Sequence, residues 1–149
     1  MNTVTINDIR KFSPCYDPTK YLPEDWQGTA LDILNVTDCP KVDRLWVVLR
    51  NEFFTDKELR LFAVYCARQV QHLMTDERSI NAINVAEKFA NGEATEEELA
   101  AAWDAASGAA WDAARAAARA AGDAASGAAW DAARAAQIEE LKRILNNQN

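Results

Sequence analysis

Histidine, cysteine and proline are all scarce in this chain of 149 residues. The single histidine, His72, and the three cysteines, Cys15, Cys39 and Cys66, do not occur at the spacing of zinc ligands. An odd number of widely spaced cysteines also argues against a disulfide framework. We therefore expect no metal site, no cofactor and no disulfide scaffold.

Long hydrophobic runs are absent as well. The N-terminal residues MNTVTINDIRKF lack the charged start and apolar stretch of a signal peptide. Charged residues interrupt every apolar segment before it reaches the length that spans a bilayer. These absences predict a cytoplasmic protein that does not contact a membrane.

Basic residues are outnumbered: the chain has 16 Lys and Arg against 23 Asp and Glu, a formal net charge of −7. Residues 1–92 hold 13 acidic and 11 basic residues, whereas residues 93–149 hold 10 and 5. Such a chain repels phosphate backbones and anionic lipid headgroups, so we expect no direct nucleic-acid partner. The acidity is compatible with a basic protein partner, and equally with solubility alone.

No arrangement of residues in the sequence points to catalysis. There is no glycine-rich phosphate loop and no nucleophile elbow. Cys66 and His72 lie six residues apart in one expected helix, which places them about 120° from a shared face. We therefore predict a protein that is not an enzyme. An enzyme that uses Asp25, Asp32 or Cys66 is the alternative.

Helical periodicity is the main signal that the sequence does contain. Val42, Leu45, Trp46 and Leu49 follow the i, i+3, i+4, i+7 spacing of a buried stripe, and Asp38 precedes Pro40 as a candidate N-cap. Further helices are expected at about residues 6–12, 29–35, 56–74 and 77–91. Capping-box patterns occur at Thr55–Glu58 and Thr95–Glu98, and Asn91-Gly92 is a helix stop signal.

The helix expected at 56–74 has the widest apolar face and should be central in the core. The residues expected on that face are Leu59, Phe62, Ala63, Cys66, Val70 and Leu73. No segment alternates in the manner of a β-strand. The predicted fold class is all-α: a compact multi-helix domain at 1–92, followed by a long alanine-rich helical arm at 93–149.

The arm contains 22 alanines within the 37 residues from Ala100 to Ala136. Residues 103–118 recur as residues 122–137, with 14 of 16 positions identical. Alanine is the best helix former, so this tract should be helical. A repeat of 19 residues rotates the second copy by about 100° on a straight helix. We expect one long helix, kinked or straight, with a hairpin near Gly122 as the alternative.

Each copy of the repeat carries Trp, Asp and Arg on neighbouring positions of the expected helix. Trp and Arg four residues apart share a face, and Asp and Arg three apart can form ion pairs. The candidate protein-binding residues are Trp103, Trp111, Asp112, Arg115, Trp130, Asp131 and Arg134. Alternatively, the tryptophans only supply bulk where a slender alanine helix meets the core or a second helix.

Four segments, in this order, resemble the alanine-rich immunity-protein family of bacteria and their phages. They are DWQGTALDIL (25–34), DRLWVVLR (43–50), LRLFAVYCAR (59–68) and INVAEKFANGEA (83–94), followed by an Ala/Trp/Arg-rich tail. The resemblance covers residues 15–145 and implies a helical, non-enzymatic protein that neutralises a toxin or attacking protein. Ser107-Gly108 and Ser126-Gly127 depart from the family's tail and bring into question whether the helix is straight.

The resemblance and the acidic arm together predict an inhibitor that occludes a target protein: a toxin, a nuclease or a defence complex. The tryptophans of the arm would be its anchors, because Trp is enriched at binding hot spots. The alternative is a structural module whose arm only builds a homo-oligomer. A face of alanine, glycine and serine lets two helices approach closely, and it buries little area per residue without such a neighbour.

We therefore expect the chain to form a homodimer through the alanine-rich tract. Light scattering should give a molar mass of about twice the 16.5 kDa of one chain. A monomer at high protein concentration would contradict this expectation.

Overall fold

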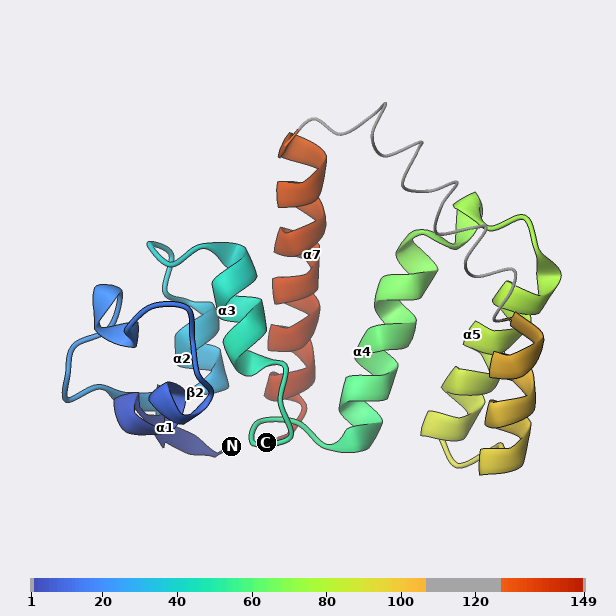
Figure 1. Cartoon of the computed structure of the whole chain (residues 1–149), viewed down its shortest axis with the longest axis horizontal. Helices are drawn as coiled ribbons and strands as arrows, with labels where there is room; N and C mark the ends of the chain where they lie inside the picture. Colours follow the sequence, from blue (N-terminus) through green and yellow to red (C-terminus); the bar gives the residue numbers. More distant parts are fainter. Residues whose placement is uncertain (1, 107–126, 149) are drawn as a thin grey trace. The chain divides into compact units, whose positions relative to one another are not determined.

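A computed structural model describes residues 2–106 and 127–148 (Figure 1). These residues fall into two compact units: the first joins the chain up to Thr55 with the residues from Asp131 onward, and the second lies within Asp56–Trp130. The predicted division into a domain at 1–92 and an arm at 93–149 stays a prediction. Gly122, where we expected a kink or hairpin, lies outside the described residues.

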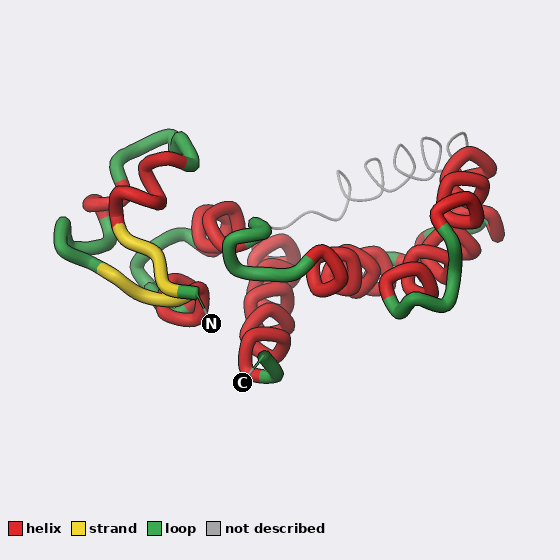
Figure 2. The backbone as a smooth tube through the Cα atoms, turned by 90° about the horizontal axis from the view of Figure 1, so that it is seen from below, coloured by secondary structure: helices red, strands yellow, loops and turns green. Residues whose placement is uncertain are grey.

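The first unit begins with two short strands, each of which leads directly into a helix. Strand β1 (Thr3–Thr5) pairs antiparallel with β2 (Gln27–Thr29), with Val4 opposite Gly28 (Figure 2). They are followed by α1 (Ile6–Lys11) and α2 (Ala30–Leu34). The described chain is thus mainly helical, as predicted, with one small two-stranded sheet that the prediction does not include. Three-residue strands are too short to show an alternating pattern.

The same capping device ends both strands and begins both helices. Thr5 accepts a hydrogen bond from the Asp8 amide, and the Asp8 carboxylate accepts one from the Thr5 amide at 3.0 Å. Thr29 and Asp32 repeat this arrangement at the start of α2, with the reciprocal bond at 2.7 Å. Hydrogen bonds from Lys11 and Thr5 hold the pKa of Asp8 far below its usual range. Each box satisfies amide groups that a helix start otherwise leaves unpaired.

A long loop between α1 and β2 is held to α1 by Arg10. Its guanidinium bonds Asp17 at 2.9 Å and Glu24 at 2.6 Å, so one cation joins two positions of the loop. A 3-10 turn at Pro18–Lys20 lies between them. These groups are exposed, so their role is to fix the path of the loop more than to add stability.

Helix α3 (Lys41–Val48) differs from its sequence prediction in two ways. Its N-cap is Pro40 without a side-chain cap, so Asp38 does not serve as one. Of the predicted stripe, Leu45 is buried, whereas Val42, Trp46 and Leu49 are exposed by 47, 42 and 37%. The buried face is instead Arg44, Leu45 and Val48. The buried face of the helix therefore differs from the predicted one, and the Val42–Trp46 edge lines a pocket instead of the core.

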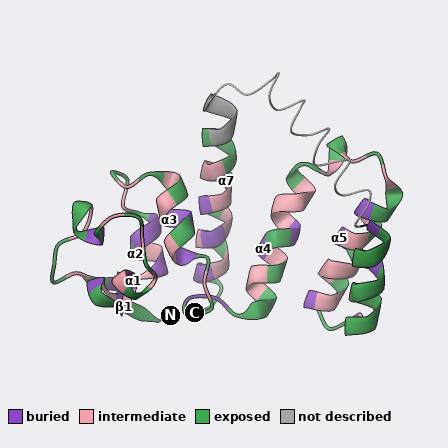
Figure 3. Cartoon of the chain, in the orientation of Figure 1, coloured by how far each residue is buried: buried purple, intermediate pink, exposed green. Residues whose placement is uncertain are grey.

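Helix α7 (Gly127–Asn146) returns the C-terminal end of the chain to the first unit, where it runs beside α3 (Figure 1). Ile138, Leu141 and Leu145 are buried at the i, i+3, i+7 spacing of one helical face, and Figure 3 shows buried positions recurring along α7. The other buried hydrophobic side chains of this unit are aliphatic or aromatic. They are Val4, Ile6, Ile9, Ala30, Ile33, Leu34, Leu45, Val48, Phe53 and Phe54.

The second unit is built from α4 (Asp56–Gln69), α5 (Glu77–Ala90) and a further helical segment at 96–106. Helix α4 begins as predicted but ends five residues early, before a 3-10 turn at Gln71–Leu73. Val70 and Leu73 are 45 and 49% exposed. A longer helix would therefore have buried little, and the extension to residue 74 is wrong.

Among the residues that the structure describes, the buried ones of the second unit are fewer and smaller than those of the first. They include Phe62, Val64, Ile83, Ala90, Ala102 and Ala106. Ala63, predicted for the core face of α4, is exposed, and Leu59 and Cys66 are only half-buried. Helix α4 is therefore not the central, deeply buried element that its sequence predicts.

The helix boundaries around residues 90–98 agree with the prediction. Gly92 has a φ of +77° and ends α5, and the Glu93 amide donates back to the Lys88 carbonyl. This left-handed conformation suits glycine because a side chain would be strained there. Thr95 and Glu98 form the predicted capping box, with reciprocal bonds of 2.8 and 3.2 Å.

The packing of α7 against residues 1–55 can be tested at Leu141, which is fully buried. We expect Leu141→Ala to lower the free energy of unfolding by about 2–5 kcal/mol, because it removes core volume. Chemical denaturation provides the measurement. The control, Leu73→Ala, changes an exposed leucine and should cost less than about 1 kcal/mol. Equal costs for the two variants would show that α7 does not pack in this core.

Candidate functional site

Trp103 is the predicted binding residue that the structure presents most openly. It lies in the helical segment 96–106, and its side chain is 65% exposed. It borders a pocket of about 370 Å³, here called the Trp103 pocket, between α4, α5 and this segment. The other lining residues are Arg60, Ala63, Val64, Ala67, Ala82, Ile83, Ala86, Phe89 and Leu99. The walls are therefore apolar, apart from one arginine.

Charge in the described part of the second unit is mainly negative. Residues 56–106 include ten acidic and five basic side chains. Glu96 and Glu97 are exposed in the first turn of the segment that carries Trp103, and Glu96 is seven residues before it on the same helical face. Arg60 lies over the ring of Phe89 at 4.7 Å, so its cation is already in contact with an aromatic face. The Trp103 pocket therefore has apolar walls, and exposed carboxylates lie in the same helical segment as Trp103.

Asp131 and Arg134, from the second copy of the repeat, lie in the first unit. They line a polar pocket of about 300 Å³ with residues 37–42 and Arg44. Asp131 forms an ion pair with Lys41 at 2.9 Å, and this bond lowers the pKa of Asp131. Lys41 is a partner that sequence spacing does not indicate, because it is 90 residues away.

The other predicted binding residues have side chains outside the described part of the chain. Trp111, Asp112 and Arg115 lie outside the described residues. Trp130 is within α7, but its side chain also lies outside what is described. Of the two Trp/Asp/Arg clusters, the described side chains are those of Asp131 and Arg134, and the use of both clusters stays a prediction.

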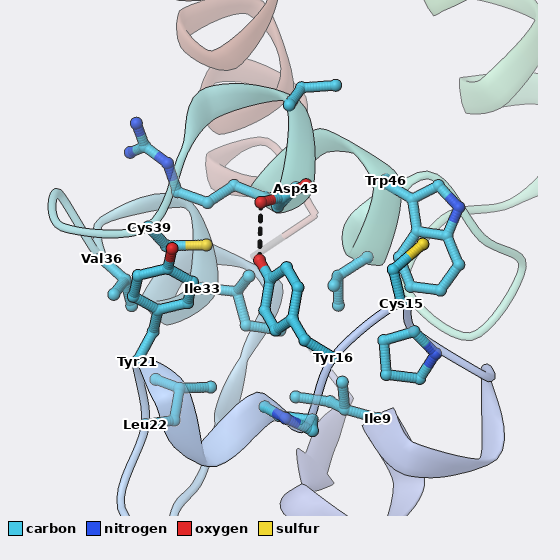
Figure 4. Close-up of a pocket in the computed structure, with 15 residues that line it drawn as sticks. Ile9, Cys15, Tyr16, Tyr21, Leu22, Ile33, Val36, Cys39, Asp43 and Trp46 are labelled. Atoms are coloured by element: carbon cyan, nitrogen blue, oxygen red, sulfur yellow. Dashed lines mark hydrogen bonds between the residues drawn. The ribbon is translucent and has the colours of Figure 1, made fainter.

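The first unit contains an apolar pocket that the sequence does not predict (Figure 4). Its volume is about 160 Å³, and we call it the Tyr16 pocket. The lining comes from α1, the loop after it, α2 and α3. It consists of Ile9, Pro14, Cys15, Tyr16, Pro18, Tyr21, Leu22, Ile33, Val36, Cys39, Val42, Asp43, Arg44, Trp46 and Val47. Its one sequence signal is the apolar Val42–Trp46 edge, which we assigned to the core.

Polar chemistry in the Tyr16 pocket is concentrated at one hydrogen bond. The Tyr16 hydroxyl donates to the Asp43 carboxylate at 2.6 Å, and Figure 4 shows the two side chains pointing toward one another. Burial, followed by this bond, raises the pKa of Tyr16 well above its usual value. Burial also raises the pKa of the Cys39 thiol. The Tyr16 hydroxyl and the Cys39 thiol are therefore protonated and are not nucleophiles.

Cations of the chain itself occupy aromatic faces around the Tyr16 pocket. The Lys20 ammonium lies 4.9 Å from the ring centre of Tyr16 and 5.2 Å from that of Tyr21. Arg50 lies 4.5 Å from the ring of Trp46. The two tyrosines meet edge to face at 5.6 Å. These contacts fix the rings in position, and they place positive charge near the faces that an added cation would use.

Two further observations concern the described residues alone. No three His, Cys, Asp or Glu side chains among them gather closely enough to hold a metal ion. Within the same residues, every helix is too short or too polar to cross a bilayer.

The Tyr16–Asp43 bond should contribute measurably to stability. We expect Tyr16→Phe to lower the free energy of unfolding by about 1–2 kcal/mol at pH 7, since a carboxylate loses a partially buried donor. Urea unfolding is the measurement. Because the folded state holds the tyrosine proton more tightly, the contribution is complete below about pH 10 and is lost as the pH rises further.

Tyr21→Phe is the matched control for this experiment. It removes the same hydroxyl from the neighbouring ring, which meets Tyr16 edge to face at 5.6 Å. A change below about 0.5 kcal/mol is expected. The same loss in both variants would rule out a specific role for Asp43.

Comparison of the chain with protein-family models, with curated proteins and with solved structures found no match. The resemblance to the immunity-protein family therefore rests on the four sequence segments and the tail.

Proposed function

We propose that this protein is a non-enzymatic inhibitor of immunity or phage anti-defence type, which binds a target protein and occludes it. The observation that carries the proposal is Trp103, whose indole is 65% exposed at the edge of the apolar Trp103 pocket. The family resemblance supports the inhibitory role. The contact surface is supported by the chemistry of the pocket itself.

Exposed tryptophan next to an apolar pocket has a physical advantage in binding. The indole offers a large apolar area with few rotatable bonds, so little conformational entropy is lost when a partner covers it. The alanines that line the pocket, such as Ala63 and Ala67, leave room for an apolar side chain of the partner. Residues of this kind contribute most of the free energy at protein interfaces.

Charge favours a basic partner. The exposed Glu96 and Glu97 lie in the same helical segment as Trp103 and would meet cationic groups at the edge of the interface. Enzymes that act on nucleic acids carry such groups, because they neutralise phosphates. Electrostatic complementarity of this type increases the rate of association and selects among partners. A nuclease or a nucleic-acid-directed defence complex is therefore the target class that we propose.

The test compares wild type with Trp103→Ala in binding to a partner captured from host lysate, identified and then purified. We expect the Kd of Trp103→Ala for the partner, measured by calorimetry, to be about 30-fold higher than that of wild type, because a hot-spot residue is removed. The partner's activity, measured in the same preparations, should be inhibited at equimolar wild type and recover with the variant.

Trp46→Ala is the matched control, because it removes a similarly exposed tryptophan from the other unit. Its affinity should equal that of wild type. Circular dichroism must show that both variants fold. If Trp103→Ala binds and inhibits like wild type, the Trp103 pocket is not the binding surface.

A further inference from the structure

We propose that the Tyr16 pocket is a binding site for a small neutral molecule with one six-membered ring and one hydrogen-bond donor, of the class of phenol. This inference goes beyond the proposed function. It concerns the other unit and does not depend on Trp103.

The volume of the pocket sets the size of the ligand. It measures about 160 Å³. An engineered protein cavity of about 150 Å³ with apolar walls binds benzene, so one ring fits this space. Side chains such as Ile9, Ile33 and Val36 supply the apolar walls. A ring that leaves water for such walls is favoured by the hydrophobic effect.

The entrance lies on the side of α3. Val42 and Trp46 belong to the lining, yet they are 47 and 42% exposed. Large apolar side chains that both line a pocket and meet solvent mark the place where the pocket opens. A ligand therefore reaches the interior past these two residues.

The polar groups of the pocket select the hydrogen-bonding character of the ligand. Asp43 accepts the Tyr16 hydroxyl at one oxygen, Oδ2. An ionised carboxylate has acceptor positions beyond a single bond, so Asp43 can also accept a donor of the ligand. A hydroxyl on the ring meets this requirement, and a plain hydrocarbon does not.

Charge considerations select a neutral ligand. A ligand carboxylate would be repelled by Asp43 and would lose its hydration on entering apolar walls. The cation of the lining, Arg44, is buried and already donates to the Leu34 carbonyl at 2.7 Å. A ligand ammonium would compete with Lys20 and Arg50, which already face the aromatic rings of Tyr16, Tyr21 and Trp46. Both signs of charge are therefore disfavoured relative to a neutral hydroxyl.

The experiment titrates the full chain, labelled with ¹⁵N, with phenol and follows amide resonances by NMR. We expect saturable shifts confined to the residues around the pocket. Benzoate and benzylamine should bind at least about tenfold more weakly than phenol, because each buries a charge. Benzene should also bind more weakly, because it offers no donor to Asp43.

Two variants decide whether the pocket is the site. Val36→Phe and, independently, Val47→Phe fill the interior and should reduce phenol affinity at least about tenfold. Val70→Phe makes the same change at an exposed position of the other unit and should leave binding unchanged. The amide spectrum of each variant reports whether it folds.

Several outcomes would overturn the proposal: shifts spread over the surface, equal binding of phenol and benzoate, or wild-type affinity in a folded Val36→Phe or Val47→Phe protein. If these variants instead lose the protein partner while no small ring binds, the pocket holds a side chain of that partner. Trp103→Ala should bind phenol like wild type, so this test and that of the proposed function fail independently.

Discussion

Burial of Leu141 and Leu145 against the N-terminal third of the chain is the interaction on which the arrangement of the first unit depends. Both side chains are fully buried, and they join α7 to residues 1–55. The described ends of the chain then reach the same segment: Asn2 donates to the Glu52 carbonyl, and Gln148 to that of Phe53. The alanine-rich tract cannot supply such a core, because alanine buries little area. The large side chains that follow it therefore determine where its C-terminal end lies.

Local signals in the sequence predict helix boundaries well, and they predict burial less well. Thr95–Glu98 and Gly92 lie where expected, because capping depends on neighbouring residues only. The patterns Thr5-x-x-Asp8 and Thr29-x-x-Asp32 likewise mark helix starts, but they do not indicate the short strands that precede them. The faces of α3 and α4 depend on packing between distant segments. Periodicity identifies an apolar face, but it does not say whether that face meets a core, a pocket or solvent.

The two candidate sites differ in what sequence can indicate. Trp103 is recognisable from residue type alone, because the alanines that surround it in the sequence are too small to cover an indole ring. The Tyr16 pocket combines residues from 9 to 22 with residues from 33 to 47, and no motif joins them. Its Tyr16–Asp43 bond spans 27 positions of sequence. Such a pocket depends on the path of the loop that Arg10 holds, and loop paths follow from tertiary contacts.

The contrast between the two cores explains why the proposed interface lies in the second unit. The first unit buries leucine, isoleucine and phenylalanine, whereas the described part of the second relies partly on alanine and leaves Trp103 65% exposed. A unit with few buried apolar contacts opens locally at low free-energy cost. A partner that covers the Trp103 pocket would bury apolar surface that is exposed in the free protein. Binding and folding of the second unit would then reinforce each other, because a ligand that binds only the folded state stabilises it.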